Sequence, residues 1–128
     1  MFDYIEEIIT AFEKAAPGKH ITKSRAAPAN IFVVHKYFKK LNYSKSVAFH
    51  NLVVKTLYAT KQARPDTCTS ISFVTMRIRE SDEDDWDKLV WLMQYLTGTR
   101  TLPLILSSNG SGILKWWVDT SFAVHPNM

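Results

Sequence analysis

Three amphipathic helical patterns follow one another between Ser44 and Gly98, separated only by short breaks. In each pattern apolar side chains recur three and four positions apart, which places them on one face of a helix. Arg64-Pro65-Asp66 separates the first two patterns, because proline lacks a backbone donor and disfavours helical geometry in the residue before it. Short connections make consecutive helices pack as neighbours. We therefore expect helices at 44–63, 66–80 and 84–98 that share one core.

Capping residues support these boundaries. Ser44 can cap the first helix, Ser81 with Asp84 resembles a capping box ahead of the third, and Gly98 suits the position that closes it. The side chains expected to point inward are Phe49, Leu52, Val53 and Leu57 in the first helix, Ile71, Val74 and Ile78 in the second, and Trp86, Leu89, Val90 and Met93 in the third.

The N-terminal part predicts one further helix. Residues 3–16 carry apolar side chains at helical spacing, and Pro17-Gly18 ends the pattern. The following stretch, to about Pro28, has no helical or strand periodicity and is interpreted as a loop or linker. The short run 31–34 is expected to form a helical turn. The side chains that define the stripe of the N-terminal helix are Ile5, Ile8, Ile9 and Phe12.

Beyond Gly98 the pattern changes to that of strands. Residues 102–106 and 113–119 are rich in β-branched, aromatic and other apolar side chains, and the turn-forming run 108–112 separates them. A hairpin is expected here, with part of its apolar surface packed on the 86–96 helix. The expected fold is thus α+β and mainly α: three to four packed helices followed by a C-terminal β-hairpin, as an incomplete domain.

Charge is distributed unevenly along the chain. The net charge is +4, yet eleven basic and no acidic side chains lie between Lys14 and Pro65, whereas acidic residues prevail from Asp66 onward. Such a segment is typical of phosphate binding, and it equally fits a solvated lysine-rich linker. The candidate nucleic-acid-binding residues are Lys36, Lys39, Lys40, Lys45, Lys55, Lys61 and Arg64.

Several classes of protein are disfavoured. The chain begins with an acidic segment rather than a basic leader, and no apolar run approaches the length of a membrane span, so an intracellular protein without membrane association is expected. A single cysteine, Cys68, excludes an internal disulfide framework. Three histidines at fifteen-residue intervals (His20, His35 and His50) match no common zinc spacing, and no cofactor is expected.

Four ordered segments carry a resemblance to a known family. They are Phe49–Ala59, an aromatic-led helix ending in Leu-Tyr; Arg64-Pro65-Asp66; Asp84-Asp85-Trp86 leading into Gln94-Tyr95-Leu96-Thr97-Gly98-Thr99; and Trp117-Val118-Asp119-Thr120-Ser121-Phe122-Ala123. In this order they resemble the pol polyprotein of Copia-type retrotransposons, where the end of the reverse transcriptase leads into ribonuclease H.

The resemblance implies regions, a metal residue and partners. It divides the chain into an N-terminal helix with a basic linker (1–43), a helical region similar to the polymerase's thumb or connection (44–100), and a truncated start of ribonuclease H (101–128). Asp119 corresponds to the first metal-binding carboxylate of ribonuclease H, which would hold Mg²⁺ only in a complete parent domain. Ser121 departs from the family's second aspartate. The implied partners are an RNA/DNA template–primer duplex, bound weakly and without sequence preference, and the rest of the polyprotein.

This fragment is not expected to be an enzyme. Two-metal chemistry requires several converging carboxylates, and the polymerase's aromatic-x-Asp-Asp turn would lie upstream of Met1. Two alternatives remain open: a free-standing basic helical module that binds nucleic acid or protein, and a non-functional transposon remnant.

Overall fold

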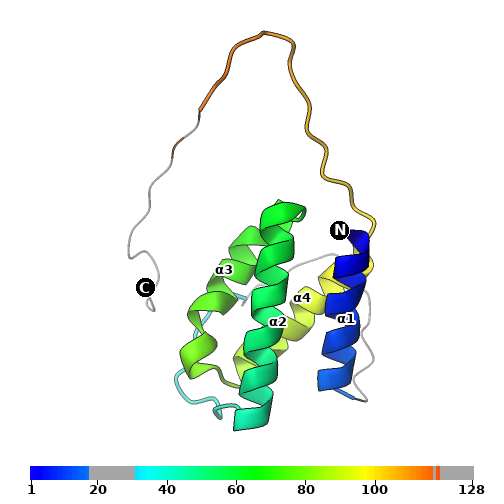
Figure 1. Ribbon diagram of the computed structural model, residues 1–128. Coiled ribbons are helices and arrows are strands. Elements are labelled where there is room, and N and C mark those ends of the chain that lie inside the picture. Colours follow the sequence, from blue (N-terminus) through cyan, green and yellow to red (C-terminus); the bar gives the residue numbers. More distant parts are fainter. Residues whose placement is uncertain (18–30, 117, 119–128) are drawn as a thin grey trace.

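The computed structural model describes residues 1–17, 31–116 and 118, and four α-helices dominate this part of the chain. Helices that follow one another in the chain run in opposite directions; α2 stands between α1 and α3, and α4 crosses behind α2 (Figure 1). The expectation of a mainly helical fold with four packed helices is confirmed. The elements are α1 (Phe2–Ala15), α2 (Tyr43–Gln62), the 3₁₀ helix η1 (Pro65–Thr67), α3 (Cys68–Met76), the 3₁₀ helix η2 (Ile78–Glu80) and α4 (Glu83–Gly98).

All four helices contribute to a single core. Trp86 is 1% exposed; its ring stacks on Phe12 with centroids 5.8 Å apart and lies 6.5 Å from the ring of Phe49. Because Phe12 belongs to α1, the N-terminal helix shares this core with the region 44–98. Large aromatic side chains dominate the energetics of such a core. Its buried members are Ile8, Phe12, Phe49, Leu52, Val53, Ala59, Ile71, Phe73, Val74, Trp86, Leu89, Leu92, Met93 and Leu96.

Apolar periodicity identified most of the buried positions. The four apolar side chains predicted to line α1 are all buried, and so are most of those predicted for α2 and α4. Leu57, Ile78 and Val90 are only partly buried, at the margin of the core. Phe73, Leu92 and Leu96 are additional core residues.

Two helices begin with caps other than those expected. Asn42 caps α2, because its Oδ1 accepts a hydrogen bond from the backbone N–H of Lys45 at 2.8 Å. In α4 the capping box is formed by Asp82 and Asp85, one residue after the predicted pair. Ser81 does not take this role. Its backbone is extended, and its carbonyl accepts the N–H of Leu41 at 3.1 Å rather than an N–H of the first helical turn.

The predicted helix 66–80 is wrong in its extent. It is divided into η1, α3 and η2; α3 ends at Met76, and its C-cap residue Arg77 binds Asp85 in the first turn of α4. The helical turn predicted for 31–34 is also not found. A turn at 31–32 leads into irregular chain instead, with Ile31 buried at 3% exposure.

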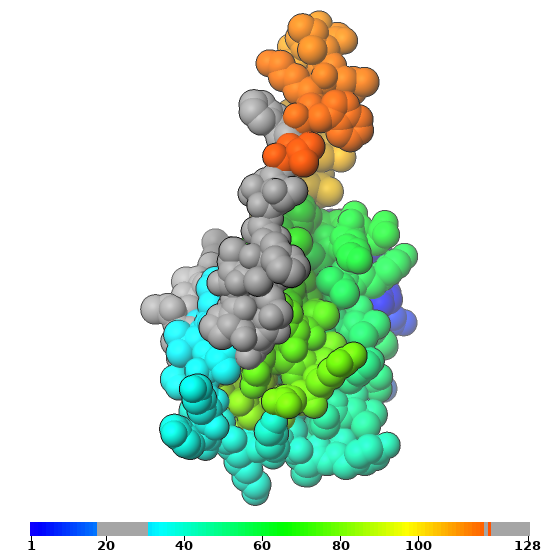
Figure 2. Space-filling model, turned by 90° about the vertical axis from the view of Figure 1, so that its left-hand side faces the viewer, coloured from blue at the N-terminus to red at the C-terminus, as the bar shows by residue number. Residues whose placement is uncertain are grey.

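Residues 101–116 leave the bundle as an extended segment. No residue among them is in a strand, and the segment protrudes from the helices in both views (Figures 1 and 2). Leu104 is 46% exposed and Trp116 is 85% exposed in this segment, and the packing of a hairpin on α4 stays a prediction. Trp117 and Asp119 of the second predicted strand lie outside the described residues, so the hairpin stays a prediction.

Candidate functional site

The basic segment before α2 is held against the acidic start of α4. The backbone N–H of Glu83 donates to the carbonyl of Lys39 at 3.0 Å, and Lys40 forms an antiparallel bridge with Asp82. This pairing fixes the segment next to the N-termini of α2 and α4. Four of the predicted phosphate-binding side chains lie on or next to this paired segment, between residues 36 and 45, and we call them the lysine cluster: Lys36, Lys39, Lys40 and Lys45.

Part of the lysine cluster is neutralised within the molecule. Lys40 forms an exposed ion pair of 3.3 Å with Glu80. Lys45 pairs with Glu83, and its ammonium lies 4.8 Å from the centroid of the Trp86 ring. Lys36 and Lys39 are exposed and have no ion pair with any residue that the structure describes. The uneven charge distribution seen in the sequence therefore also serves internal pairing, and Lys36 and Lys39 keep no ion-pair partner among the described residues.

A buried lysine on α4 was not anticipated. The ammonium of Lys88 lies 2.7 Å from the carboxylate of Asp84, donates to the carbonyl of Val33, and is 5.0 Å from the ring centroid of Phe73. These contacts tie the irregular segment 31–34 to α4. The spacing of four residues between Asp84 and Lys88 was visible in the sequence as a helical ion-pair pattern.

Arg64 is held in a hydrogen-bonded network inside the protein. It is 2% exposed, and its guanidinium binds both carboxylate oxygens of Asp66, with the shorter contact at 2.8 Å. It also donates to the backbone carbonyl of Thr99 at 3.1 Å and to the Thr99 hydroxyl at 2.7 Å. These contacts of the guanidinium are all within the protein, and the assignment of Arg64 to nucleic-acid binding stays a prediction that this burial does not favour.

The charge state of this network is set by its geometry. Burial opposes the ionised carboxylate of Asp66, yet hydrogen bonds from Arg64 and from the Tyr95 hydroxyl outweigh it and lower the pKa of Asp66 below 3.8. Burial, together with the hydrogen bond to Asp66, raises the pKa of Tyr95 above 10.0. An ionised Asp66 and a neutral Tyr95 are thus the stable forms between these limits.

The two remaining predicted lysines lie apart from the cluster. Lys61 is exposed near the C-terminal end of α2, about 24 Å along the helix from Lys45 at 1.5 Å per residue. Lys55 is partly buried on the side of α2 that faces α1. The six predicted lysines therefore comprise the lysine cluster and two separate positions, Lys55 and Lys61, rather than one continuous surface.

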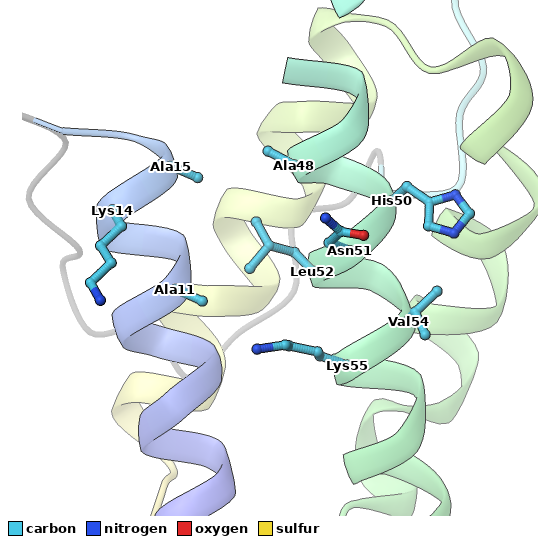
Figure 3. Close-up of a pocket in the computed structure, with 9 residues that line it drawn as sticks. All are labelled: Ala11, Lys14, Ala15, Ala48, His50, Asn51, Leu52, Val54 and Lys55. Atoms are coloured by element: carbon cyan, nitrogen blue, oxygen red, sulfur yellow. The ribbon is translucent and has the colours of Figure 1, made fainter. Parts of the chain in front are cut away.

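A groove of about 660 Å³ lies between α1 and α2 (Figure 3). Alanines of both helices face the gap, and Lys55 extends from α2 toward α1. Lys14 of α1 is also among the lining residues, although its side chain in Figure 3 extends away from α2. Small residues four positions apart on α1 were a sequence feature that could have indicated it. The lining residues are Ala11, Lys14, Ala15, Ala48, His50, Asn51, Leu52, Val54 and Lys55.

The structure offers no metal centre among the residues it describes. No three His, Cys, Asp or Glu side chains gather there in a way that could hold an ion. His35 lies beside the ring of Phe38 at 5.2 Å, and His50 is exposed on α2. Asp119, the carboxylate assigned to metal binding by resemblance, lies outside the described residues.

Comparison of the chain with models of known protein families, with curated proteins and with solved structures finds no match in any of the three. Within the described part of the chain, none of the helices combines the length and apolar character needed to cross a membrane.

Proposed function

We propose that this chain is a piece of a Copia-type retrotransposon polyprotein, from the end of the reverse transcriptase to the start of ribonuclease H, and that it contacts the template–primer duplex. In this proposal residues 44–100 are the thumb- or connection-like helices. Residues 101–128 begin the ribonuclease H sheet as a hairpin that requires further strands, and Asp119 is its first Mg²⁺ ligand.

One observation carries the proposal. Two of the segments on which the resemblance rests, Arg64-Pro65-Asp66 and 94–99, are thirty residues apart in sequence and meet in a single hydrogen-bonded network. Arg64 binds Thr99, and Asp66 accepts the hydroxyl of Tyr95 at 2.8 Å. A buried arginine needs such partners, because leaving a charge unpaired in the interior is costly. This network gives a physical reason for the two segments to occur together in one chain, which supports the resemblance in the helical region.

The lysine cluster supports the nucleic-acid role. Lys36 and Lys39 are exposed cations without described ion-pair partners, and the pairing of 39–41 with 81–83 holds them at one end of the bundle. A lysine ammonium binds phosphate as a point charge without reading the base sequence. Binding through this surface is therefore expected to be weak, sequence-tolerant and governed by counterion release.

The test is the salt dependence of duplex binding. An RNA–DNA hybrid is titrated with the wild-type chain and with Lys36→Gln/Lys39→Gln at several salt concentrations. The slope of log affinity against log salt should become shallower by about 2 for two lost phosphate contacts. Lys14→Gln/Lys115→Gln removes the same charge elsewhere and should leave the slope nearly unchanged. Equal slopes for all three proteins would refute the assignment of the cluster.

Catalysis is tested separately. Incubation with a primed template, or with an RNA–DNA hybrid, in Mg²⁺ or Mn²⁺ should give neither extension nor cleavage, because both chemistries need several converging carboxylates. Cleavage that disappears in Asp119→Asn would contradict the proposal that the chain is inactive alone.

A free-standing binding module is the second candidate, and the core favours it. Every buried apolar side chain among the described residues lies between Ile5 and Leu96, so the bundle encloses its core without the segment 101–116. A bundle of this kind can fold and bind a partner by itself. If the hybrid is not bound while a protein ligand is, this candidate replaces the first.

A further inference from the structure

We propose that the segment 36–45 binds an unpaired nucleic-acid strand: the rings of Tyr37 and Tyr43 stack on bases, and Lys36 and Lys39 contact the neighbouring phosphates. The inference rests on the nucleic-acid role proposed for the lysine cluster, and it names the form of nucleic acid that this cluster recognises. The observation behind it is a pair of almost fully exposed aromatic rings among the lysines.

These two rings take no part in the packing of the bundle. Tyr37 is 98% exposed and Tyr43 is 86% exposed. Neither ring contacts another aromatic ring, and neither hydroxyl makes a hydrogen bond, with any residue that the structure describes. Burial in the core accounts for Phe49 and Trp86 but not for these two tyrosines. Both faces of each ring are therefore open to a ligand.

The backbone between the two rings is fixed to the bundle. The pairing of 39–41 with 81–83 holds it, and Tyr43 is the first residue of α2. The segment lies at the end of the bundle where α2 begins, shown in cyan in Figure 1, and its side chains project from the same end in Figure 2. Six residues span at most about 22 Å, so one short strand can reach both rings.

The charge of the segment itself is positive. Residues 31–45 include the four lysines of the lysine cluster and no acidic side chain. The acidic residues that face the segment come from η2 and the start of α4. Of these, Glu80 pairs with Lys40 at 3.3 Å and Glu83 pairs with Lys45 at 2.5 Å.

The other acidic residues at the start of α4 are paired inside the bundle. Asp82 and Asp85 both bind Arg77, and Asp84 binds Lys88. This group carries one more negative than positive charge. Asp82 and Asp85 form the capping box at the N-terminus of α4, where the helix dipole favours negative charge. These carboxylates are thus satisfied by the protein.

Two lysines of the segment remain as a positive surplus. Beyond the paired groups, the exposed Arg79 and Asp87 are of opposite sign. Lys36 and Lys39 are exposed and have no ion pair with a described residue. An uncompensated pair of cations beside exposed rings attracts a polyanion.

Rings and cations together match an unpaired strand better than a duplex. An aromatic ring stacks on any base, and a lysine contacts phosphate without reading the sequence, so such binding is sequence-tolerant. Stacking needs a base face that is not already covered. Unpaired bases can be splayed out to offer one, whereas the bases of a duplex cover one another. The two tyrosines would add nothing to duplex binding.

An anionic membrane surface fits the segment less well. Peripheral attachment uses a large apolar face, typically that of an amphipathic helix. Residues 36–42 are not helical, and Leu41, the apolar side chain between the lysines and Tyr43, packs against the core. The segment therefore presents separate rings rather than an apolar face.

The experiment offers one DNA sequence in two forms to the full chain. The forms are a single strand of about 12 nucleotides, within the usual footprint of about 4–16, and its blunt hybrid with complementary RNA. Fluorescence anisotropy measures both affinities. Tyr37→Ala/Tyr43→Ala should weaken single-strand binding at least about tenfold, because two stacked bases are lost, and should change hybrid binding less than about twofold. Tyr37→Phe/Tyr43→Phe keeps the rings and should bind the single strand within about twofold of wild type.

The matched control is Trp116→Ala, which removes a ring that is 85% exposed outside the segment and should leave single-strand affinity within about twofold. Circular dichroism verifies that every variant is folded. The lysines are tested with Lys36→Gln/Lys39→Gln. The slope of log affinity against log salt for the single strand should become shallower by about 1.4, or about 0.7 for each lost phosphate contact.

The inference is overturned if the single strand is not bound, if removing the two rings weakens both forms equally or neither, or if the lysine variant keeps the single-strand slope. Loss of binding to phosphatidylserine vesicles in Tyr37→Ala/Tyr43→Ala, with unchanged single-strand affinity, would assign the rings to a membrane instead. Failure of the proposed duplex contact is a separate result. It shows as an unchanged salt slope on the hybrid, and ring-dependent binding of the single strand would still support the inference.

Discussion

The guanidinium Nε of Arg77 lies 3.1 Å from Oδ2 and 3.2 Å from Oδ1 of Asp85, and the two side chains are only 10% and 3% exposed. This ion pair joins the end of α3 to the first turn of α4. Asp85 also accepts the backbone N–H of Asp82 at 3.1 Å, so one carboxylate completes both the capping box and the salt bridge. Buried charge therefore helps to fix the turn between the two helices, beside the contacts of Met76 and Ile78 with the apolar core.

Removal of this carboxylate should be strongly destabilising. Asp85→Ala leaves Arg77 charged and buried without its main partner and removes half of the capping box, so the free energy of unfolding should fall by about 3–5 kcal/mol. Urea unfolding followed by circular dichroism measures it. The control is Glu80→Ala, which breaks the exposed pair with Lys40 and should cost less than about 1 kcal/mol. Similar losses in the two variants would contradict a structural role for Asp85.

Arg64 should be required for stability rather than for phosphate binding. Arg64→Lys keeps the charge but loses the planar fork that binds Asp66 and Thr99 at once, and an unsatisfied buried acceptor costs about 1–3 kcal/mol. The variant should unfold at lower urea concentration while its salt slope for duplex binding stays that of wild type. The opposite pattern, with unchanged stability and a shallower slope, would return Arg64 to the nucleic-acid surface.

The same network should produce a defined acid sensitivity. The pKa of Asp66 in the folded chain is below its ordinary 3.8, so the folded state favours the ionised carboxylate. Its contribution is present above pH 3.8 and is lost as pH falls through the folded pKa. The difference in unfolding free energy between wild type and Asp66→Asn should therefore be largest near neutral pH and shrink below about pH 4. Asp85 titrates in both proteins and largely cancels from the difference. A difference independent of pH down to about 2 would show that Asp66 is not held ionised by Arg64.

The helices could be predicted because their apolar periodicity and their packing agree. Ile8 and Phe12 in α1, like Phe49 in α2, lie where the pattern places them, and the proline after Arg64 ends α2 as expected. Helix ends were less predictable, since they depend on contacts far along the chain. Ser81 and Asp82 are equally good caps by residue type, and the pairing of Leu41 with the Ser81 carbonyl decides between them.

The site residues could not be assigned from charge alone. Arg64 and Lys36 look alike in a basic segment, yet one is buried against Asp66 and the other is exposed. The pairing of lysines with acidic residues depends on tertiary contacts. Lys40 and Glu80, for example, are forty residues apart, and no rule of sequence spacing predicts their ion pair. The groove could not be predicted either, because its walls come from two helices, α1 and α2, whose relative placement depends on tertiary contacts. Only the alanine spacing within α1 was accessible to sequence reasoning.

The extended segment 102–116 should exchange its amide hydrogens faster than any helix of the bundle. Its strand-forming side chains have no partner strand among the described residues, and Ile105, Leu106 and Leu114 are 79% or more exposed. The hydrogen bonds found for its amides are local: the amide of Leu102 donates to the carbonyl of Thr99, and three others donate to side chains within the turn 108–112. A lone hairpin is marginal in water, because it buries little apolar area and leaves its edges unpaired. Hydrogen exchange followed by mass spectrometry should therefore show little protection across 102–116 and strong protection in α2 and α4.

Two further proteins make this last test specific. Truncation after Leu102 should leave the protection of α2 and α4 unchanged, since no residue beyond Leu96 is among the buried core residues. Fusion to a complete ribonuclease H domain that supplies the missing strands should slow exchange across 102–116 in particular. Strong protection of this segment in the chain alone would mean that it already has a core of its own, and the proposal that it begins a larger sheet would have to be abandoned.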